Sequence, residues 1–239
     1  MNRAYAVVDD FLSPQEHLAL WTAFQDADRI PGGLHAWSRG YRRSSGDDAA
    51  GPAPRAPSLR EDAAAGPPLP PSLQVFSEKL FAAMTGDRPP LAVAPWTGFS
   101  LGTWTYSPGT GLGWHSDTGW LAGYIYYLHP VWSSNWGGEL LVAAEDDDAP
   151  SGAKSIALSA AHSAPALAAS GGTGDAAESV CRTGGAFVYP RPNRLVLLRG
   201  GTLHCIKKVE SAAGKSARTS LSGFFFNTDN ENASTQHRA

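Results

Sequence analysis

The sequence is poor in cysteine, in excess charge and in long apolar runs. Its two cysteines, Cys181 and Cys205, have no C-x-x-C spacing, which excludes a disulfide framework and is typical of a reducing compartment. The net charge of −3 gives no indication of a nucleic-acid surface. No apolar run reaches the roughly 18 residues of a membrane span, and the first ten residues lack a signal-peptide apolar segment. We therefore expect a soluble, cytoplasmic protein with no nucleic-acid or membrane partner.

The apolar residues that are present are sufficient for one packed domain. They make up 42% of the 239 residues. Residues 1–95 are expected to form an N-terminal helical support, and short strands with frequent turns over residues 96–227 predict a β-sandwich or barrel. These strands are expected at about 99–104, 114–117, 121–129, 138–142, 186–190, 194–198, 205–209 and 219–226.

Two amphipathic helices are predicted within residues 1–95. Ser13 and Glu16 form a capping-box pattern around Pro14, which suits the first helical position. The helix is expected to extend to about residue 27, with one face that holds Leu18, Trp21 and Phe24. A second helix is expected from 72 to about 85, with a face that holds Leu73, Phe76, Leu80 and Met84.

Two segments interrupt this pattern. Residues 42–72 are rich in Ala, Gly and Pro, which is typical either of a surface loop or of a lid over a functional site. Residues 145–185 contain few large apolar residues, so we interpret them as an insertion, partly loop and partly helical around 155–169. The acidic run 145–148 lacks the ligand spacing of a calcium loop and indicates a solvated turn.

The motif with the clearest chemistry is His115-Ser116-Asp117, followed much later by His204 and Arg218. Residues i and i+2 of a strand face the same side, so one strand end presents both His115 and Asp117 to an ion. Two imidazoles and one carboxylate are the ligand set of a non-heme Fe(II) site. The glycines Gly200 and Gly201 suit a turn that brings His204 into such a site, and the guanidinium of Arg218 suits a carboxylate. An H-x-D triplet alone is a weak signal, because it arises often by chance.

The ordered series of segments around these residues resembles the Fe(II)/2-oxoglutarate-dependent dioxygenases, and most of all their prolyl 4-hydroxylase-like branch. The resemblance covers residues 96–227 and, more loosely, the N-terminal third. It implies a mainly β double-stranded β-helix, or jelly roll. The segments that carry it, in chain order, are Val8-Asp9-Asp10-Phe11-Leu12-Ser13, Tyr106-Ser107-Pro108-Gly109, His115-x-Asp117, Tyr124-Ile125-Tyr126-Tyr127-Leu128, Trp136-Gly137-Gly138-Glu139-Leu140, Pro192-Asn193-Arg194-Leu195-Val196-Leu197-Leu198, His204 and Arg218-Thr219-Ser220. Two features depart from the branch: the long insertion, and Arg218 where collagen-type enzymes carry a lysine.

The resemblance also implies a reaction and a set of cofactors. His115, Asp117 and His204 would bind Fe(II), and 2-oxoglutarate would bind both the iron and Arg218. Ser220 would donate a second hydrogen bond to this cosubstrate, and Tyr127 and Tyr106 are candidates for further donors, although both also suit a core aromatic position. With O2, the enzyme would hydroxylate an unactivated carbon and release succinate and CO2.

The substrate is predicted less closely than the cofactors. We expect a small molecule, either an amino acid or a natural-product intermediate, because no repeat or extra domain for binding a peptide is visible. Hydroxylation of a prolyl or other residue in a peptide or protein is the alternative. Candidate substrate-contacting residues are Trp104, Trp114, Trp120, Phe224 and Arg39. Trp120 equally suits packing, and a solvated loop suits Arg39 better than a substrate contact does.

Three other classes of protein compete with this interpretation. A halogenase on the same scaffold would replace the carboxylate ligand with a small residue, which Asp117 argues against. A non-catalytic jelly-roll binding module would be expected to have lost a member of the triad or Arg218. A cupin-type metalloprotein would show more histidines at the metal. The remaining histidines, at positions 17, 35, 129, 162 and 237, lack a metal-like context, and Cys205 is expected in the core.

Overall fold

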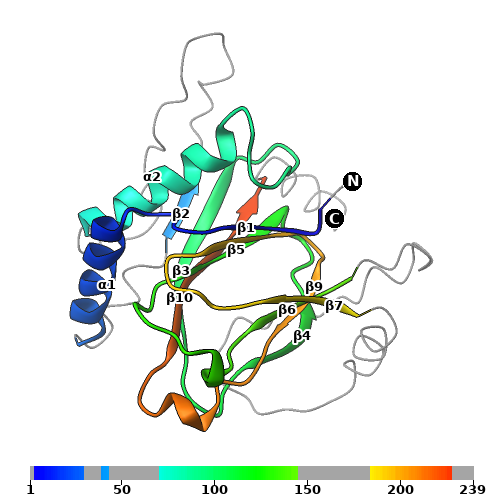
Figure 1. The fold of residues 1–239 in the computed structure, drawn as a ribbon. Coiled ribbons are helices and arrows are strands. Elements are labelled where there is room, and N and C mark those ends of the chain that lie inside the picture. Colours follow the sequence, from blue (N-terminus) through cyan, green and yellow to red (C-terminus); the bar gives the residue numbers. More distant parts are fainter. Residues whose placement is uncertain (1–2, 30–38, 43–69, 145–183, 228–239) are drawn as a thin grey trace, which may run out of the picture.

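A computed structural model describes residues 3–29, 39–42, 70–144 and 184–227 of the chain. Most of the predicted lid segment and of the predicted insertion, including its helical part, lies outside these residues. Two antiparallel sheets face each other, and two helices cover the outer side of the larger sheet (Figure 1). Among the described residues, no helix is long and apolar enough to span a membrane.

The larger sheet has six strands in the order β1-β8-β5-β10-β3-β2. Their bounds are β1 Tyr5–Val8, β8 Leu195–Arg199, β5 Ala122–Tyr127, β10 Arg218–Phe226, β3 Gly98–Tyr106 and β2 Arg39–Arg42. The smaller sheet has the order β4-β9-β6-β7, with β4 Leu112–Ser116, β9 Leu203–Ile206, β6 Leu140–Ala143 and β7 Gly185–Val188. Single turns of 3-10 helix occur at η2 (Ser134–Trp136) and η3 (Ser211–Ala213).

Two of these strands differ from the sequence prediction. Strand β2 was not predicted, because its four residues, Arg39 to Arg42, have no apolar alternation. Strand β9 begins at Leu203 and so contains His204, whereas the sequence predicted a strand that starts only after this histidine. The glycine turn before it has the expected place, with Gly201 at a φ of 79°.

The space between the two sheets is filled by apolar side chains from both. These are Ile125, Tyr127, Val196 and Leu198 from the larger sheet, and Leu140, Val142, Val188 and Ile206 from the smaller one. Full burial of a side chain of this size contributes about 1.5–3 kcal/mol. This core holds the two sheets at a fixed separation, so residues on their facing sides have defined positions.

Helix α1 (Pro14–Asp28) begins with the predicted capping box. The hydroxyl of Ser13 accepts a bond from the Glu16 N–H at 3.3 Å, and the Glu16 carboxylate accepts one from the Ser13 N–H at 2.8 Å. The prediction that Leu18 lies on the buried face is wrong, since its side chain is 61% exposed while Leu20 and Phe24 are buried. Leu18 and Leu20 differ by about 200° around the helix axis, so they lie on opposite faces.

Helix α2 (Pro71–Thr85) lies against the outer face of the larger sheet, as its apolar pattern predicts. Its buried residues include all four that were expected, Leu73, Phe76, Leu80 and Met84. The Phe76 ring packs 4.9 Å from the Tyr126 ring of β5, measured between centroids. The helices therefore support the side of the sheet opposite to the one that faces β4 and β9.

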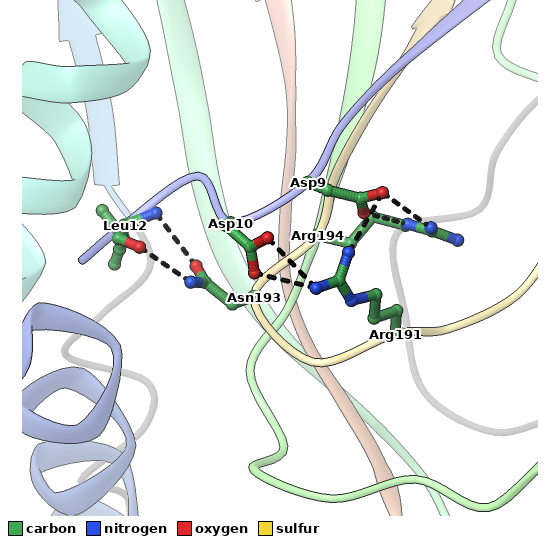
Figure 2. Close-up of polar contacts among 6 residues, drawn as sticks. All are labelled: Asp9, Asp10, Leu12, Arg191, Asn193 and Arg194. Atoms are coloured by element: carbon green, nitrogen blue, oxygen red, sulfur yellow. Dashed lines mark hydrogen bonds and ion pairs between the residues drawn. The ribbon is translucent and has the colours of Figure 1, made fainter. Parts of the chain in front are cut away.

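The N-terminal segment is attached to the turn before β8 by polar contacts (Figure 2). The amide of Asn193 mimics a backbone pair: it accepts a bond from the Leu12 N–H at 2.9 Å and donates one to the Leu12 carbonyl at 2.7 Å. The Tyr126 hydroxyl donates to the same amide oxygen at 2.9 Å. On the surface, Arg194 pairs with Asp9 and Arg191 contacts Asp9 and Asp10. These contacts fix the end of β5, whose last residue is Tyr127.

Candidate metal and carboxylate site

The two histidines of the predicted ligand set lie directly opposite each other on neighbouring strands. His115 of β4 is the cross-strand partner of His204 of β9, and the centroids of their rings are 4.2 Å apart. Side chains of directly opposed residues in an antiparallel pair lie on one face of the sheet. Strand pairing therefore brings together two imidazoles that are far apart in the sequence.

Asp117 joins them from the turn that follows β4. Its Oδ2 lies 3.6 Å from the Nε2 of His204, and one ligand atom from each of the three residues lies within 4.8 Å of the others. The Asp117 carbonyl accepts a hydrogen bond from the N–H of Gly201 at 3.2 Å. This turn lies so close to Gly200 that a Cβ there would be 1.8 Å from the Trp120 carbonyl oxygen. The predicted glycine pair is therefore required where the two turns meet.

The orientation of both rings suits metal binding through Nε2. The Nδ1 atoms of His115 and His204 lie 2.8 Å from the carbonyl oxygens of Gly113 and Thr202, which fixes each imidazole with Nδ1 as the donor. Burial, together with the neighbouring His115, lowers the pKa of His204 to about 4, so this imidazole is neutral at physiological pH. A neutral imidazole with a free Nε2 is the form that binds a metal. In the part of the chain that the structure describes, these three residues form the one cluster with metal-ligand geometry.

Arg218 lies at the start of β10 and is fully buried. Its Nε donates to the Gly138 carbonyl at 2.8 Å, and its Nη2 donates to the Tyr127 hydroxyl at 3.3 Å. The guanidinium carbon also lies 5.4 Å from the Tyr106 ring centroid and 4.8 Å from that of Tyr127. Its Nη1 is buried without a hydrogen-bond partner, and no carboxylate pairs with it among the described residues. A buried cation with an unused donor fits an anionic ligand such as a carboxylate.

Three further residues of the predicted cosubstrate set surround Arg218. Ser220 lies opposite Tyr127 across the β10–β5 pair, and Tyr106 lies opposite Arg218 across the β10–β3 pair, so all four share one face. The Ser220 hydroxyl lies 3.4 Å from that of Ser222. Burial raises the pKa of Tyr106, against the opposing effect of the Arg218 charge, so its phenol keeps its proton as a donor.

The predicted substrate residues are brought together only in part. Trp120 stacks on Phe224 with ring centroids 5.1 Å apart and planes 14° apart. Trp104 lies opposite Ser220 and is 55% exposed. Trp114 is half-buried and precedes His115, so it lies on the other side of β4. For Arg39 the structure gives only its pairing with Leu101, so its predicted role stays a prediction.

Two contributors to the site were not predicted from the sequence. The carbonyl of Gly138 accepts a hydrogen bond from Arg218 and so orients it. The sequence signal for this turn was the pair Gly137-Gly138, and Gly138 has a positive φ of 73°. His129 lies behind Arg218, where its Nδ1 lies 3.2 Å from both backbone groups of Thr219 and its Nε2 lies 2.9 Å from the Pro190 carbonyl. No sequence signal distinguished this histidine. Like His17, it lies outside the metal cluster, as expected; histidines 35, 162 and 237 lie outside the described residues.

Comparisons with known proteins agree with this arrangement. The family model for the 2OG-Fe(II) oxygenase superfamily matches residues 101–226, more than half of the chain. A prolyl-4-hydroxylase from Pseudomonas putida is 14% identical with a TM-score of 0.51, over 94% of this chain and 86% of that one. EctD from S. alaskensis, solved with 2-oxoglutarate and 5-hydroxyectoine, is 13% identical with a TM-score of 0.52, over 96% and 74%.

A third structural match has a peptide partner. A prolyl hydroxylase from Trichoplax adhaerens, in complex with a peptide fragment of hypoxia inducible factor, is 13% identical with a TM-score of 0.50, over 97% of this chain and 87% of that one. At such low identity, these likenesses show the fold alone, and they confirm the expected double-stranded β-helix. No curated protein sequence matches the chain.

Proposed function

We propose, from the premise that the chain belongs to the 2OG-Fe(II) oxygenase superfamily, that it hydroxylates an unactivated carbon of a small molecule. Membership makes the protein a 2-oxoglutarate-dependent dioxygenase that uses Fe(II), 2-oxoglutarate and O2. The assignment of individual residues to these groups, and the class of substrate, are the proposed part. The single observation that carries the assignment is the convergence of His115, Asp117 and His204 within 4.8 Å.

In this proposal His115, Asp117 and His204 bind Fe(II). The donor set suits the metal, because two imidazoles and one carboxylate leave open positions for other ligands. The hydrogen bonds from Nδ1 to Gly113 and Thr202 support it, since they direct the Nε2 atoms away from the backbone without any ion being needed. The site is therefore preorganised for a metal.

Arg218 binds the distal carboxylate of 2-oxoglutarate in the same proposal. The support is its buried Nη1, which has no partner, on a guanidinium whose other nitrogens are held by Gly138 and Tyr127. Tyr106, Tyr127 and Ser220 lie on the same face, where their hydroxyls are suited to complete the cosubstrate pocket.

The chemistry comes from the bound groups, and the protein supplies position and shielding. Iron with 2-oxoglutarate and O2 supplies oxidative decarboxylation to succinate and CO2, coupled to hydroxylation of a C–H bond. Arg218 and the tyrosines fix the direction of the cosubstrate, and the buried core beneath them excludes water from its carboxylate. Trp120 and Phe224 form a stacked pair after the metal-binding turn, and together with the exposed Trp104 they are proposed to contact the apolar part of the substrate.

The metal assignment is tested by an anaerobic titration. Addition of Fe(II) and 2-oxoglutarate to the purified protein is expected to produce a weak visible charge-transfer band. The variants His115→Ala and Asp117→Ala should lose it, whereas Asp26→Ala, at an exposed surface ion pair, should keep it. A band that persists in a folded His115→Ala protein would contradict the assignment.

The substrate class is tested by succinate release. The iron-loaded protein is screened with free amino acids, nucleosides and short peptides. The amount of hydroxylated product is compared with the amount of succinate released. Coupled turnover of one or more small molecules is expected. Turnover with proline-containing peptides and with nothing smaller would replace the small-molecule proposal by its alternative, a peptide hydroxylase.

A further inference from the structure

A second pocket lies on the outer face of the larger sheet, away from the metal cluster. Its volume is about 400 Å³, within the range of pockets that hold one small molecule. Its walls come from the last turns of α1, the end of β3, the segment after β5 and the approach to β10. Of these residues only His129, which lies behind Arg218, belongs to the surroundings of the proposed cosubstrate site.

The pocket exists because the helices cover only part of this face. Leu101 and Leu221 are buried beneath the helices, whereas Thr105, further along β3 on the same side, is exposed. Thr105 and its cross-strand partner Thr219 line the pocket beside the buried His129. The floor is therefore sheet, and α1 forms one wall.

The apolar part of the wall suits a flat ring. Trp21 and Phe24 of α1 stack with ring centroids 5.5 Å apart and planes 14° apart. Val131, which is 66% exposed, and the half-buried Trp136 contribute from the segment after β5. Phe24 is only 5% exposed, so Trp21, Val131 and Trp136 supply most of the accessible apolar surface, which suits a planar apolar ligand.

The polar part of the wall carries three charged side chains, those of Asp28, Arg29 and Lys215. Asp28 at the end of α1 and Lys215 before β10 both line the pocket, and neither has an ion-pair partner among the described residues. Arg29, which also lines it, is bound to Asp26 at 3.2 Å. A carboxylate and an ammonium that are both unpaired complement a ligand that carries both charges.

We propose that this pocket binds a free aromatic amino acid in its zwitterionic form. The carboxylate of the ligand pairs with Lys215, its ammonium pairs with Asp28, and its ring packs against Trp21 and Val131. Its binding requires neither iron nor 2-oxoglutarate, so the pocket is a site separate from that of the dioxygenase reaction.

The test is a calorimetric titration of the metal-free full-length protein with L-phenylalanine. We expect saturable binding, with an affinity in the millimolar range or tighter. Asp28→Asn and Lys215→Ala should each weaken it at least tenfold. The matched controls Asp87→Asn and Lys208→Ala, at exposed positions outside the pocket, should leave it unchanged. Phenylacetate and phenethylamine, which each lack one charge, should bind at least tenfold more weakly than phenylalanine.

Three results would overturn the proposal. The first is absence of saturable binding by the folded wild-type protein. The second is equal affinity for phenylalanine and for either singly charged analogue. The third is binding that survives both pocket variants but is lost in Trp120→Ala, which would place the amino acid at the metal site as a substrate.

Discussion

Replacing Arg218 tests the proposed cosubstrate anchor most directly. The residue is fully buried, and two of its three nitrogens are held by Gly138 and Tyr127, which leaves Nη1 for the ligand. Arg218→Gln removes the charge, whereas Arg218→Lys keeps the charge but replaces the planar fork by a single ammonium. The two variants therefore separate the contribution of charge from that of geometry.

The size of the effect follows from the contact that is lost. A hydrogen bond between charged groups contributes about 1.5–3 kcal/mol, which corresponds to a dissociation constant for 2-oxoglutarate raised about tenfold to 150-fold in Arg218→Gln. A smaller loss of affinity is expected in Arg218→Lys, because the positive charge is kept. Some loss remains, because one ammonium cannot contact the Gly138 carbonyl, the Tyr127 hydroxyl and the ligand in the same geometry.

The assay is an anaerobic titration of the Fe(II)-loaded protein with 2-oxoglutarate, followed at the charge-transfer band. Circular dichroism establishes that each variant is folded. Arg191→Gln, which removes an exposed arginine paired with Asp9, is the matched control and should bind 2-oxoglutarate like the wild type. A folded Arg218→Gln protein whose affinity stays within a factor of two would refute the reasoning.

Three further predictions concern stability. Asn193→Ala removes both bonds to the Leu12 backbone at a residue with a φ of 60°, and should lower the free energy of unfolding by about 2–4 kcal/mol in a urea titration. Burial lowers the pKa of His129 from 6.5 to about 4, so between these pH values the unfolded chain binds a proton that the folded chain does not. The free energy of unfolding should therefore fall as the pH is lowered from about 6.5 to about 4, by up to about 1.4 kcal/mol per pH unit. Urea unfolding of the metal-free protein measures this. Gly200→Ala places a Cβ against the Trp120 carbonyl oxygen and should lower the free energy of unfolding by about 1–3 kcal/mol and weaken iron binding in the charge-transfer assay.

Each of these predictions has a control in the chain. Arg191→Ala breaks exposed ion pairs of the same N-terminal attachment and should change stability by less than about 1 kcal/mol, so an equal effect of Asn193→Ala would contradict its role. Gly113→Ala introduces a methyl group into open space and should be tolerated, unlike the change at Gly200. A free energy of unfolding that is constant over the stated pH range would show that His129 does not stay neutral in the folded state.

The convergence of His115 and Asp117 was predictable because its signal is local. His115 and Asp117 are two residues apart, and a strand followed by a turn brings both to one ion whatever the rest of the fold does. The pairing with His204 was not local, since it depends on the register of β4 against β9; the glycine turn before His204 and the family resemblance pointed to it, but not to this register. The capping box at Ser13 was equally readable, because all its bonds lie within one helical turn.

The missed features depend on contacts that a sequence pattern does not encode. The periodicity of α1 allowed Leu18 as a buried residue, but in the structure the face of the helix that packs on the protein carries Leu20 instead. The carbonyl of Gly138 is a backbone group, so the glycine pair indicated a special turn but not a contact with Arg218. His129 is buried by the convergence of Pro190 and Thr219, which lie on other segments.

Arg218 and the second pocket lie on opposite faces of the larger sheet. On the inner face, Arg218 has a buried nitrogen without an acceptor, and the side chains around it are already fixed by hydrogen bonds and ring packing. On the outer face, the adjacent residue Thr219 lines the second pocket and bonds His129, whose ring lies 5.8 Å from that of Tyr127. The backbone of β10 therefore lies between Arg218 and the second pocket. Because coupling between two binding sites is reciprocal, a factor by which the outer ligand changes 2-oxoglutarate affinity must equal the factor by which 2-oxoglutarate changes the affinity of the outer ligand.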